Sequence, residues 1–446
     1  MGRPSGIHAF VEAIKHGRLK GKGIKKENQL LIGVEHEKFL FFGKEKKRVN
    51  YEQIKKIFKN LEVFGWKPTY EKENIIGLKR GKQQITTEPG LQYELSGAPL
   101  KNIHLVCSES SKHFYEVKEA SKDLDISTAS IGFDPFNPLN KVPQNPKERY
   151  RIMTKEMPKG GELSLEMMYQ TSGIQINYDY TSEKDFEKKF KVGNYLAPLA
   201  IALFANSPFA SRNFTGYLSY RNKVWQKTAR GGIMPITFES LNFEKYFDHA
   251  INYSLLFVIH EGKYIKPNGQ TFKDFMEGNF LPLKGIKATI KDFETHLATI
   301  FTEVRLKQII EVRSLDTCDW GCICNGPAFF TGLIYGALDE TFDIIKSWKK
   351  NEVMEAYLQS PKKALDTELR GKKLHQWGKI FLDIAKSGLT KRKELNSNGK
   401  DETIYLKHLE DIINRKTNRA QLLLEQFNKQ GNLNFLDNVK EDFSYS

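Results

Sequence analysis

The sequence predicts an α+β protein with a largely antiparallel sheet. Strand-like segments follow one another as hairpin neighbours, without a strict β-α-β rhythm. Several of them carry polar side chains on one face and apolar side chains on the other. After about residue 350, charged helical stretches dominate. We therefore expect one main domain over residues 1–350 and a helical C-terminal extension, residues 351–446, packed against it.

The individual elements follow from apolar periodicity and from glycine and proline punctuation. Alternating or short apolar runs predict strands over 30–42, 74–93 (two or three short strands), 124–133, 170–180 and 307–314. Helical spacing predicts helices over 51–62, 100–122, 149–157, 161–169, 183–204, 243–258, 290–302 and 327–348. In the extension, helices are expected over 365–386, 404–414 and 418–430.

Composition limits the class of protein. The chain has 446 residues, of which 39% are hydrophobic, enough for a sizeable core. No apolar run approaches the roughly 20 residues of a membrane helix, and residues 1–10 lack a secretory signal. We expect a cytoplasmic protein without a membrane partner. The net charge of +15 suits anionic ligands such as nucleotides. A nucleic-acid-binding protein is the alternative from another class, but no binding motif occurs, so no nucleic-acid partner is expected.

The four cysteines favour reduced thiols in or near a core. Cys318, Cys322 and Cys324 cluster, but no second pair follows at the spacing of a zinc site. Redox control through these residues or through Cys107 stays open.

Two carboxylates in the first strand suggest a metal site. Glu35 and Glu37 are two residues apart, so on a strand they project from the same face. Adjacent carboxylates repel one another unless a cation lies between them, and Mg²⁺ prefers such hard oxygen ligands. A solvated sheet face is the alternative interpretation.

Three further segments repeat this one-sided pattern. The turn-forming Glu88-Pro89-Gly90 precedes Glu94, and the other two segments hold the same-face pairs Gln175 with Asn177 and Glu311 with Arg313. Together the four segments predict a carboxylate-lined cavity for several Mg²⁺ ions and a polyphosphate. A P-loop is excluded, because its G-x-x-x-x-G-K-[ST] signature is missing.

Basic residues could complete such a site. Arg221 lies near Trp225, Arg230 precedes two glycines, and Arg305 precedes the last strand. Arginine can bind a carboxylate or a phosphate through two parallel hydrogen bonds. For any one of these residues, a surface ion pair is the alternative.

Several of these segments belong to longer motifs. In chain order they are residues 33–39 (GVEHEKF), 88–100 (EPGLQYELSGAPL), 132–135 (GFDP), 149–158 (RYRIMTKEMP), 295–313 (THLATIFTEVRLKQIIEVR) and 327–335 (PAFFTGLIY). This series resembles glutamate–cysteine ligase of the plant and alphaproteobacterial type, over roughly residues 30–345. The resemblance implies a glutamine-synthetase-like, curved sheet that holds ATP and Mg²⁺, with residues 1–350 as the ligase domain.

The resemblance also implies roles for single residues. The implied metal ligands or their close neighbours are Glu35, Glu37, Glu88, Glu94, Glu311 and Gln175, around two or three Mg²⁺ ions. Asn177 would lie beside the metals. Arg221, Arg230 and Trp225 would bind substrate, Arg305 would hold a substrate carboxylate, and Arg313 would neutralise the transferred phosphate. The family has glycine where this chain has Leu91, which adopts a positive φ less readily.

The implied reaction has two steps. ATP phosphorylates the γ-carboxylate of L-glutamate, and the amine of L-cysteine then displaces phosphate, the first step of glutathione biosynthesis. A related ligase with another amine acceptor is the alternative, because the acceptor pocket cannot be identified from the sequence. The protein is expected to be a monomer or a homodimer.

Overall fold

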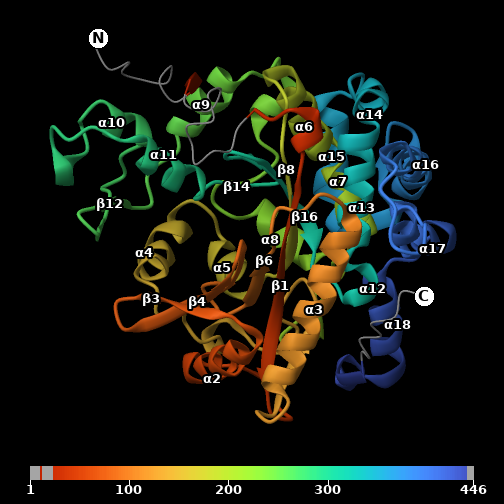
Figure 1. Ribbon diagram of the computed structural model, residues 1–446, viewed down its shortest axis with the longest axis horizontal. Helices are drawn as coiled ribbons and strands as arrows, with labels where there is room; N and C mark the ends of the chain where they lie inside the picture. Colours follow the sequence, from red (N-terminus) through yellow and green to blue (C-terminus); the bar gives the residue numbers. More distant parts are fainter. Residues whose placement is uncertain (1–10, 13–23, 439–446) are drawn as a thin grey trace.

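A ten-stranded sheet forms the centre of the protein. The computed structural model describes residues 11–12 and 24–438. The strand order is β15-β16-β8-β1-β6-β5-β4-β3, and both β2 and β7 also pair with β1 (Figure 1). Every pairing in this sheet is antiparallel. Its strands are β1 (Ile32–Phe42), β2 (Lys47–Arg48), β3 (Lys67–Glu71), β4 (Asn74–Arg80), β5 (Gln83–Thr87), β6 (Tyr93–Ser96), β7 (Ile126–Ala129), β8 (Gly173–Tyr178), β15 (Val304–Leu306) and β16 (Ile310–Asp316).

Helices cover this sheet and build the rest of the molecule. In Figure 1 a lobe with α10, α11 and the short strand β12 (Val258–His260) lies on one side, and α16 and α17 lie on the other. The helices are α2 (Tyr51–Leu61), α3 (Ile103–Ser121), α4 (Glu148–Glu156), α5 (Ser164–Gln170), α6 (Glu183–Tyr195), α7 (Ala197–Leu203), α8 (Tyr220–Gln226), α9 (Phe243–Ile251), α10 (Phe272–Met276), α11 (Ile290–Leu297), α12 (Trp320–Ile323), α13 (Asn325–Thr331), α14 (Leu338–Ile345), α15 (Lys350–Lys363), α16 (Leu374–Arg392), α17 (Lys407–Arg415) and α18 (Arg419–Gln430).

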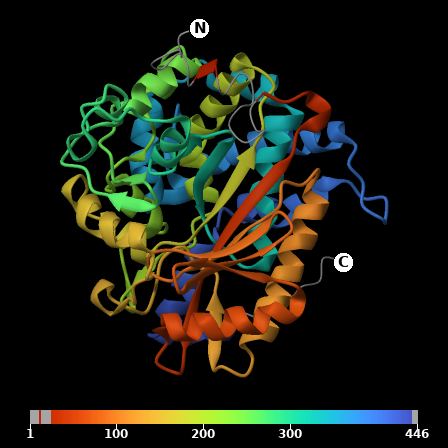
Figure 2. The ribbon, with the colours of Figure 1, turned by 60° about the vertical axis from the view of Figure 1, so that its left-hand side comes forward.

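The register of the central strands separates a polar face from an apolar one. β1 and β8 lie side by side (Figure 2), and Glu35 pairs with Gln175 in this register. The alternate residues of β8, Ile174 and Ile176, are fully buried in the largest hydrophobic cluster. One face of the sheet therefore packs under helices, and the other presents the predicted polar side chains.

The predicted strands 30–42 and 170–180 are confirmed, but two long helices are wrong. The helix expected over 183–204 is two helices, α6 and α7, which meet at Leu196 just before Pro198. The helix expected over 327–348 is interrupted by a π-helical turn, η7 (Gly332–Gly336), between α13 and α14. Apolar periodicity alone does not reveal such interruptions.

The C-terminal extension is part of the same core. The largest hydrophobic cluster joins sheet residues such as Ile176 and Val312 to Phe381, Leu406 and Leu409 of the extension. Packing is thus continuous across residue 350, and the division into 1–350 and 351–446 stays a prediction.

The cysteines differ from the expected reduced thiols. The structure joins Cys107 to Cys324 and Cys318 to Cys322, each pair with its Cα atoms 5.9 Å apart. The fold brings the first pair together across 217 residues of sequence, which cysteine spacing cannot predict.

Among the described residues, no helix is both long and apolar enough to cross a membrane.

Close helix contact at η7 gives a stability prediction. Gly388 of α16 lies against Gly332, and a methyl group on Gly388 would overlap the carbonyl oxygen of Gly332. Gly388→Ala is expected to lower the free energy of unfolding by ~2 kcal/mol, since overpacking typically costs this much. Gly378→Ala on the same helix is the control, because its nearest neighbour, a side-chain carbon of Ile413, lies 3.3 Å away. Chemical denaturation of both variants checks this, and equal stability would contradict it.

Candidate active site

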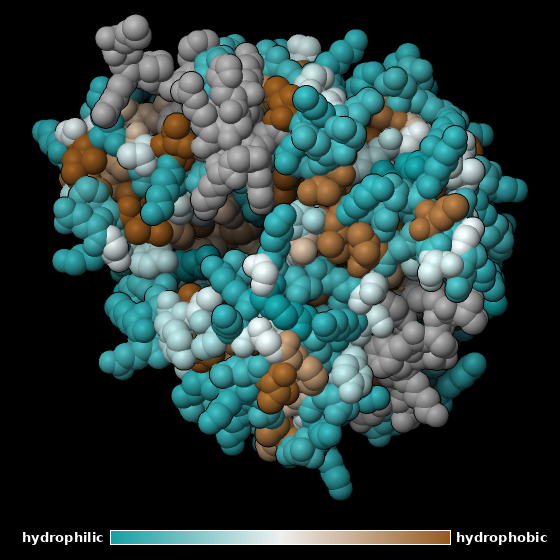
Figure 3. All heavy atoms as spheres, in the orientation of Figure 1, coloured by the Kyte–Doolittle hydropathy of each residue, from teal (hydrophilic) through white to brown (hydrophobic). Residues whose placement is uncertain are grey.

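A cavity of about 530 Å³ opens on the polar face of the sheet. Figure 3 shows this face of the molecule hollowed to the left of its centre, between the regions of α4 and α11. Eight of the twelve predicted site residues line the cavity, namely Glu35, Glu37, Glu88, Glu94, Gln175, Trp225, Arg305 and Arg313. The structure therefore gathers residues from five separate sequence segments into one site.

Four of these residues are carboxylates that crowd one another. Glu35 and Glu37 project from β1, Glu94 lies opposite Glu37 on β6, and Glu88 follows β5. Burial and the nearby Glu88 raise the pKa of Glu37 to about 7. Burial and the other three carboxylates raise the pKa of Glu94 well above its usual range. Such shifts show that negative charge is uncompensated there, as in a site that receives a cation.

Two amides border the carboxylates. Gln175 donates from Nε2 to Glu37 Oε1 at 3.1 Å and accepts from Arg313 Nη1. Asn177 donates from Nδ2 to Glu35 Oε1 at 3.0 Å, although it does not line the cavity itself. The amide of Gln175 thus joins the acidic part of the site to the basic part.

Glu311 lies apart from the four carboxylates, within the basic part. Its carboxylate is 2.5 Å from Arg305 Nε, 2.5 Å from Lys307 Nζ and 3.5 Å from Arg313 Nη1. Burial alone would raise the pKa of Glu311, but these three cations hold it well below its usual range. Glu311 is thus the counter-ion of a basic cluster of Arg305, Lys307 and Arg313, and its role as a metal ligand stays a prediction.

A bulge in β16 determines where Arg313 points. The pairing with β8 shifts register between Val312 and Leu315, so one extra residue is accommodated beside Arg313. Bulges next to active sites commonly redirect a side chain. Burial and Arg305 lower the pKa of Arg313 to about 10, and its Nε has no hydrogen-bond partner among the described residues.

Arg221 is buried and does not itself line the cavity, but two of its donors have no partner among the described residues. Its Nη2 donates to the Arg313 carbonyl at 3.0 Å, while Nε and Nη1 have no partner among the described residues. The indole of Trp225 lies between two guanidinium groups, 4.9 Å from that of Arg221 and 5.2 Å from that of Arg313. A side chain at Gly173 would lie only 2.5 Å from Arg221 Nη2, so this approach requires glycine.

Arg230, expected to bind substrate, does not line the cavity. Its guanidinium donates to Thr299 Oγ1 at 2.9 Å and to the carbonyl of Ser254. Its donors are thus used by neighbouring loops, and Thr299 rather than Arg230 reaches the cavity. A role of Arg230 in substrate binding stays a prediction.

Sequence reasoning missed another set of lining residues. Arg149 lines the cavity, its Nη2 donates to the Tyr150 hydroxyl at 2.8 Å, and its Nε is buried without a partner among the described residues. One helical turn later on α4, Met153 lies beside Met167 and Phe257 in the cavity wall. The motif at 149–158 contained Arg149 and Tyr150, but no strand-face pattern singled them out. Lys307 could have been found by its two-residue spacing from Arg305.

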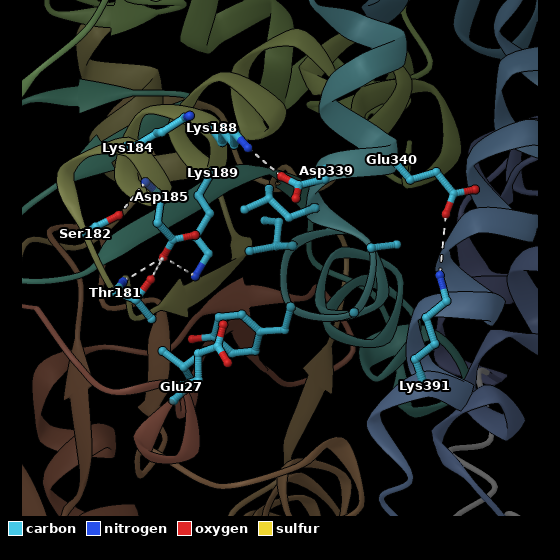
Figure 4. Close-up of a pocket in the computed structure, with 16 residues that line it drawn as sticks. Glu27, Thr181, Ser182, Lys184, Asp185, Lys188, Lys189, Asp339, Glu340 and Lys391 are labelled. Atoms are coloured by element: carbon cyan, nitrogen blue, oxygen red, sulfur yellow. Dashed lines mark hydrogen bonds and ion pairs between the residues drawn. The ribbon is translucent and has the colours of Figure 1, made fainter.

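A second pocket, of about 590 Å³, has different chemistry. Residues of α6 and α14 line it, and three of its four lysines pair with carboxylates (Figure 4). Lys188 pairs with Asp339, Lys189 with Asp185 at 2.9 Å, and Lys391 with Glu340 at 3.6 Å. Four lysines and four carboxylates line this pocket, so it offers no excess of either sign.

Comparisons with known proteins find sequence relatives over most of the chain. The sequence profile of glutamate–cysteine ligase family 2 matches residues 31–439. Chloroplastic glutamate–cysteine ligase of Nicotiana tabacum is 39% identical over 91% of this chain and 78% of its own length. The Arabidopsis thaliana enzyme of that name is 38% identical over 95% and 81%.

A solved structure is similar in fold. Glutamate–cysteine ligase of Francisella tularensis, in complex with AMP, superposes with a TM-score of 0.57 at 13% identity, covering 93% of this chain and 88% of that chain. This similarity confirms the predicted mixed fold built on a large antiparallel sheet.

The expected cytoplasmic location is wrong. The tobacco and Arabidopsis relatives are both named chloroplastic, not cytoplasmic. The missing secretory signal had favoured the cytoplasm, but residues 1–10 lie outside the described part of the chain.

Proposed function

We propose that this chain, which belongs to glutamate–cysteine ligase family 2, joins L-glutamate to L-cysteine at the expense of ATP. The product is γ-glutamylcysteine, and the reaction is the first step of glutathione biosynthesis. One observation in the structure supports this most directly. Four crowded carboxylates and a basic cluster face one cavity, as phosphoryl transfer between a nucleotide and a carboxylate requires.

The four carboxylates fit Mg²⁺. Glu35, Glu37, Glu88 and Glu94 offer hard oxygen ligands. The raised pKa values of Glu37 and Glu94 have burial as their largest cause and repulsion between carboxylates as the next, and a divalent cation would relieve that repulsion. We propose that these residues hold the two or three Mg²⁺ ions of the reaction. When bound, Mg²⁺ supplies positive charge against the polyphosphate of ATP.

The basic cluster faces the transferred phosphate. An oxygen of the glutamate γ-carboxylate attacks the γ-phosphorus, and ADP leaves. Arg305, Lys307 and Arg313 neutralise the charge that spreads over the phosphoryl oxygens. The amine of cysteine then attacks the acyl carbon, phosphate leaves, and the nitrogen loses a proton.

Two arginines with unpartnered donors could each bind one of the amino-acid substrates. Arg221 has two unpartnered donors beside Trp225, and we propose that it binds the α-carboxylate of glutamate. Arg149 has an unpartnered Nε beside Met153 and Phe257, a combination suited to the carboxylate and thiol side chain of cysteine. The polarisable methionine sulfur can pack against such a side chain.

An acceptor screen tests this function. ADP release is measured with ATP, Mg²⁺ and L-glutamate while the second amino acid is varied. Release should depend on cysteine and fall sharply with serine, which carries a hydroxyl in place of the thiol. Equal or faster release with another amine would favour the related ligase with a different acceptor.

The role of Arg221 gives a sharper prediction. Arg221→Lys keeps the charge but loses the planar fork, so the KM for glutamate should rise at least about tenfold. The KM for ATP should change less than about twofold, because Arg221 lies outside the basic cluster. Steady-state kinetics with each substrate varied separately checks this, and an equal rise in both constants would contradict it.

A further inference from the structure

Helix α15, from the C-terminal side of the chain, holds both ends of the helix that carries Arg221. The carbonyl of Pro361 accepts hydrogen bonds from the backbone N–H groups of Leu218 at 2.8 Å and Ser219 at 2.9 Å. Ser219 is the N-cap of α8. At the other end, Gln226 Nε2 donates to the carbonyl of Tyr357 at 2.6 Å. The position of α8 therefore depends on α15.

The side chain of Tyr357 extends this contact to the sheet. Its hydroxyl donates to Glu303 Oε1 at 2.5 Å, and Tyr357 and Glu303 are only 2% and 1% exposed. The backbone carbonyl of Glu303 in turn accepts from the Arg313 N–H at 2.9 Å. Tyr357 thus binds a buried carboxylate whose own backbone is hydrogen-bonded to that of Arg313.

Arg221 and Glu303 both bind the backbone of Arg313: Arg221 Nη2 donates to the Arg313 carbonyl at 3.0 Å, and the Glu303 carbonyl accepts from the Arg313 N–H at 2.9 Å. Burial and Glu303 raise the pKa of Tyr357 well above its usual range, while the positive charge of Arg221 acts in the opposite direction. A buried carboxylate seeks donors, and Arg221 keeps two of them without partners. If Glu303 turned to Arg221, it would take the donors that we assign to substrate glutamate.

We propose that Tyr357 is a positioning residue that holds the Glu303 carboxylate and so leaves Arg221 available for glutamate. This rests on the proposed function. Losing the hydroxyl leaves Glu303 to compete with the substrate carboxylate for the guanidinium. The effect falls on glutamate binding, because the basic cluster that faces the phosphate keeps its own counter-ion, Glu311.

The test is a double-mutant cycle with the full-length chain. Tyr357→Phe should raise the KM for glutamate about tenfold, as loss of a charged hydrogen bond typically does, while the KM for ATP changes less than about twofold. Adding Glu303→Gln removes the competing charge, so the double variant should regain most of the glutamate affinity. Independent structural damage predicts the opposite, namely additive losses.

Tyr405→Phe is the matched control. Its hydroxyl also connects residues 351–446 to the rest of the protein, through His104 Nδ1 at 3.0 Å. Tyr405→Phe should lower the unfolding temperature but leave the ratio of the KM for glutamate to the KM for ATP unchanged.

Three results would overturn the proposal. They are an unchanged KM for glutamate in Tyr357→Phe, no recovery in the double variant, or a tenfold loss of affinity in Glu303→Gln alone. The last result remains decisive if Tyr357→Phe does not fold. If the parent protein releases no ADP in response to glutamate, both the proposed function and the role of Tyr357 are wrong. An active parent with an unaffected variant overturns the positioning role alone.

Discussion

Purified Glu94→Gln is expected to lose at least about a hundredfold in ligase activity at saturating Mg²⁺, while the protein without metal becomes no less stable. The substitution keeps the shape of a side chain that lies opposite Glu37 and removes its negative charge. In the absence of a cation, this charge is buried among like charges, so its removal relieves repulsion. With Mg²⁺ and ATP the same charge is needed. A hundredfold loss corresponds to about 2.7 kcal/mol of lost transition-state stabilisation, which is on the order of single electrostatic contributions in active sites.

The measurement combines turnover with unfolding temperature in EDTA and in Mg²⁺. The parent should gain stability from Mg²⁺, and Glu94→Gln should lose most of that gain. Glu109→Gln is the matched control, because Glu109 is a partly buried carboxylate that accepts from Ala98 N and Gln83 Nε2 and does not line the cavity. The control should lose stability and keep its response to Mg²⁺. The same response in both variants would argue against a metal site at Glu94.

The strand-face pattern predicted much of the site because a strand has an exact period of two. Knowing that Glu35 and Glu37 share a face requires only that the segment is extended. The one-sided pair Gln175 and Asn177 follows in the same way. These residues therefore lie on the cavity side of the sheet whatever their partners are. The register, which sets Glu94 opposite Glu37, depends on hairpin geometry and becomes visible only in the structure.

Other parts of the site depend on contacts that the local sequence does not contain. Glu311 shares a strand face with Arg313, as predicted, but three cations from a hairpin gather around it. Leu91 adopts a φ of 58°, where the family has glycine. Its fully buried side chain packs in a core cluster, and this burial offsets the backbone strain. Tyr357 lies beyond every motif used to identify the family, and only tertiary packing brings it to Glu303.

The last expected result concerns Arg313, for which two interpretations predict different outcomes. Arg313 could serve only as a partner of Glu311. However, Arg305 and Lys307 approach that carboxylate to 2.5 Å, and Arg313 is the more distant at 3.5 Å. Glu311 would therefore keep two close cations without it. The fork of Arg313 is bound instead to Gln175, at the junction between the acidic and basic parts of the cavity.

Arg313→Lys is accordingly expected to lower kcat at least about tenfold with little change in unfolding temperature. Lysine retains the charge but cannot bind Gln175 and a phosphoryl oxygen at once, and loss of one such donor typically costs a few kcal/mol of transition-state stabilisation. Arg48→Lys is the contrasting control, since Arg48 is fully buried against Asp134 at 3.2 Å and does not line the cavity. It should lose stability and keep its kcat in the folded fraction. Measuring kcat and unfolding temperature on the same preparations separates the two roles. A loss of stability with normal kcat in Arg313→Lys would show that Arg313 serves only as a partner of Glu311.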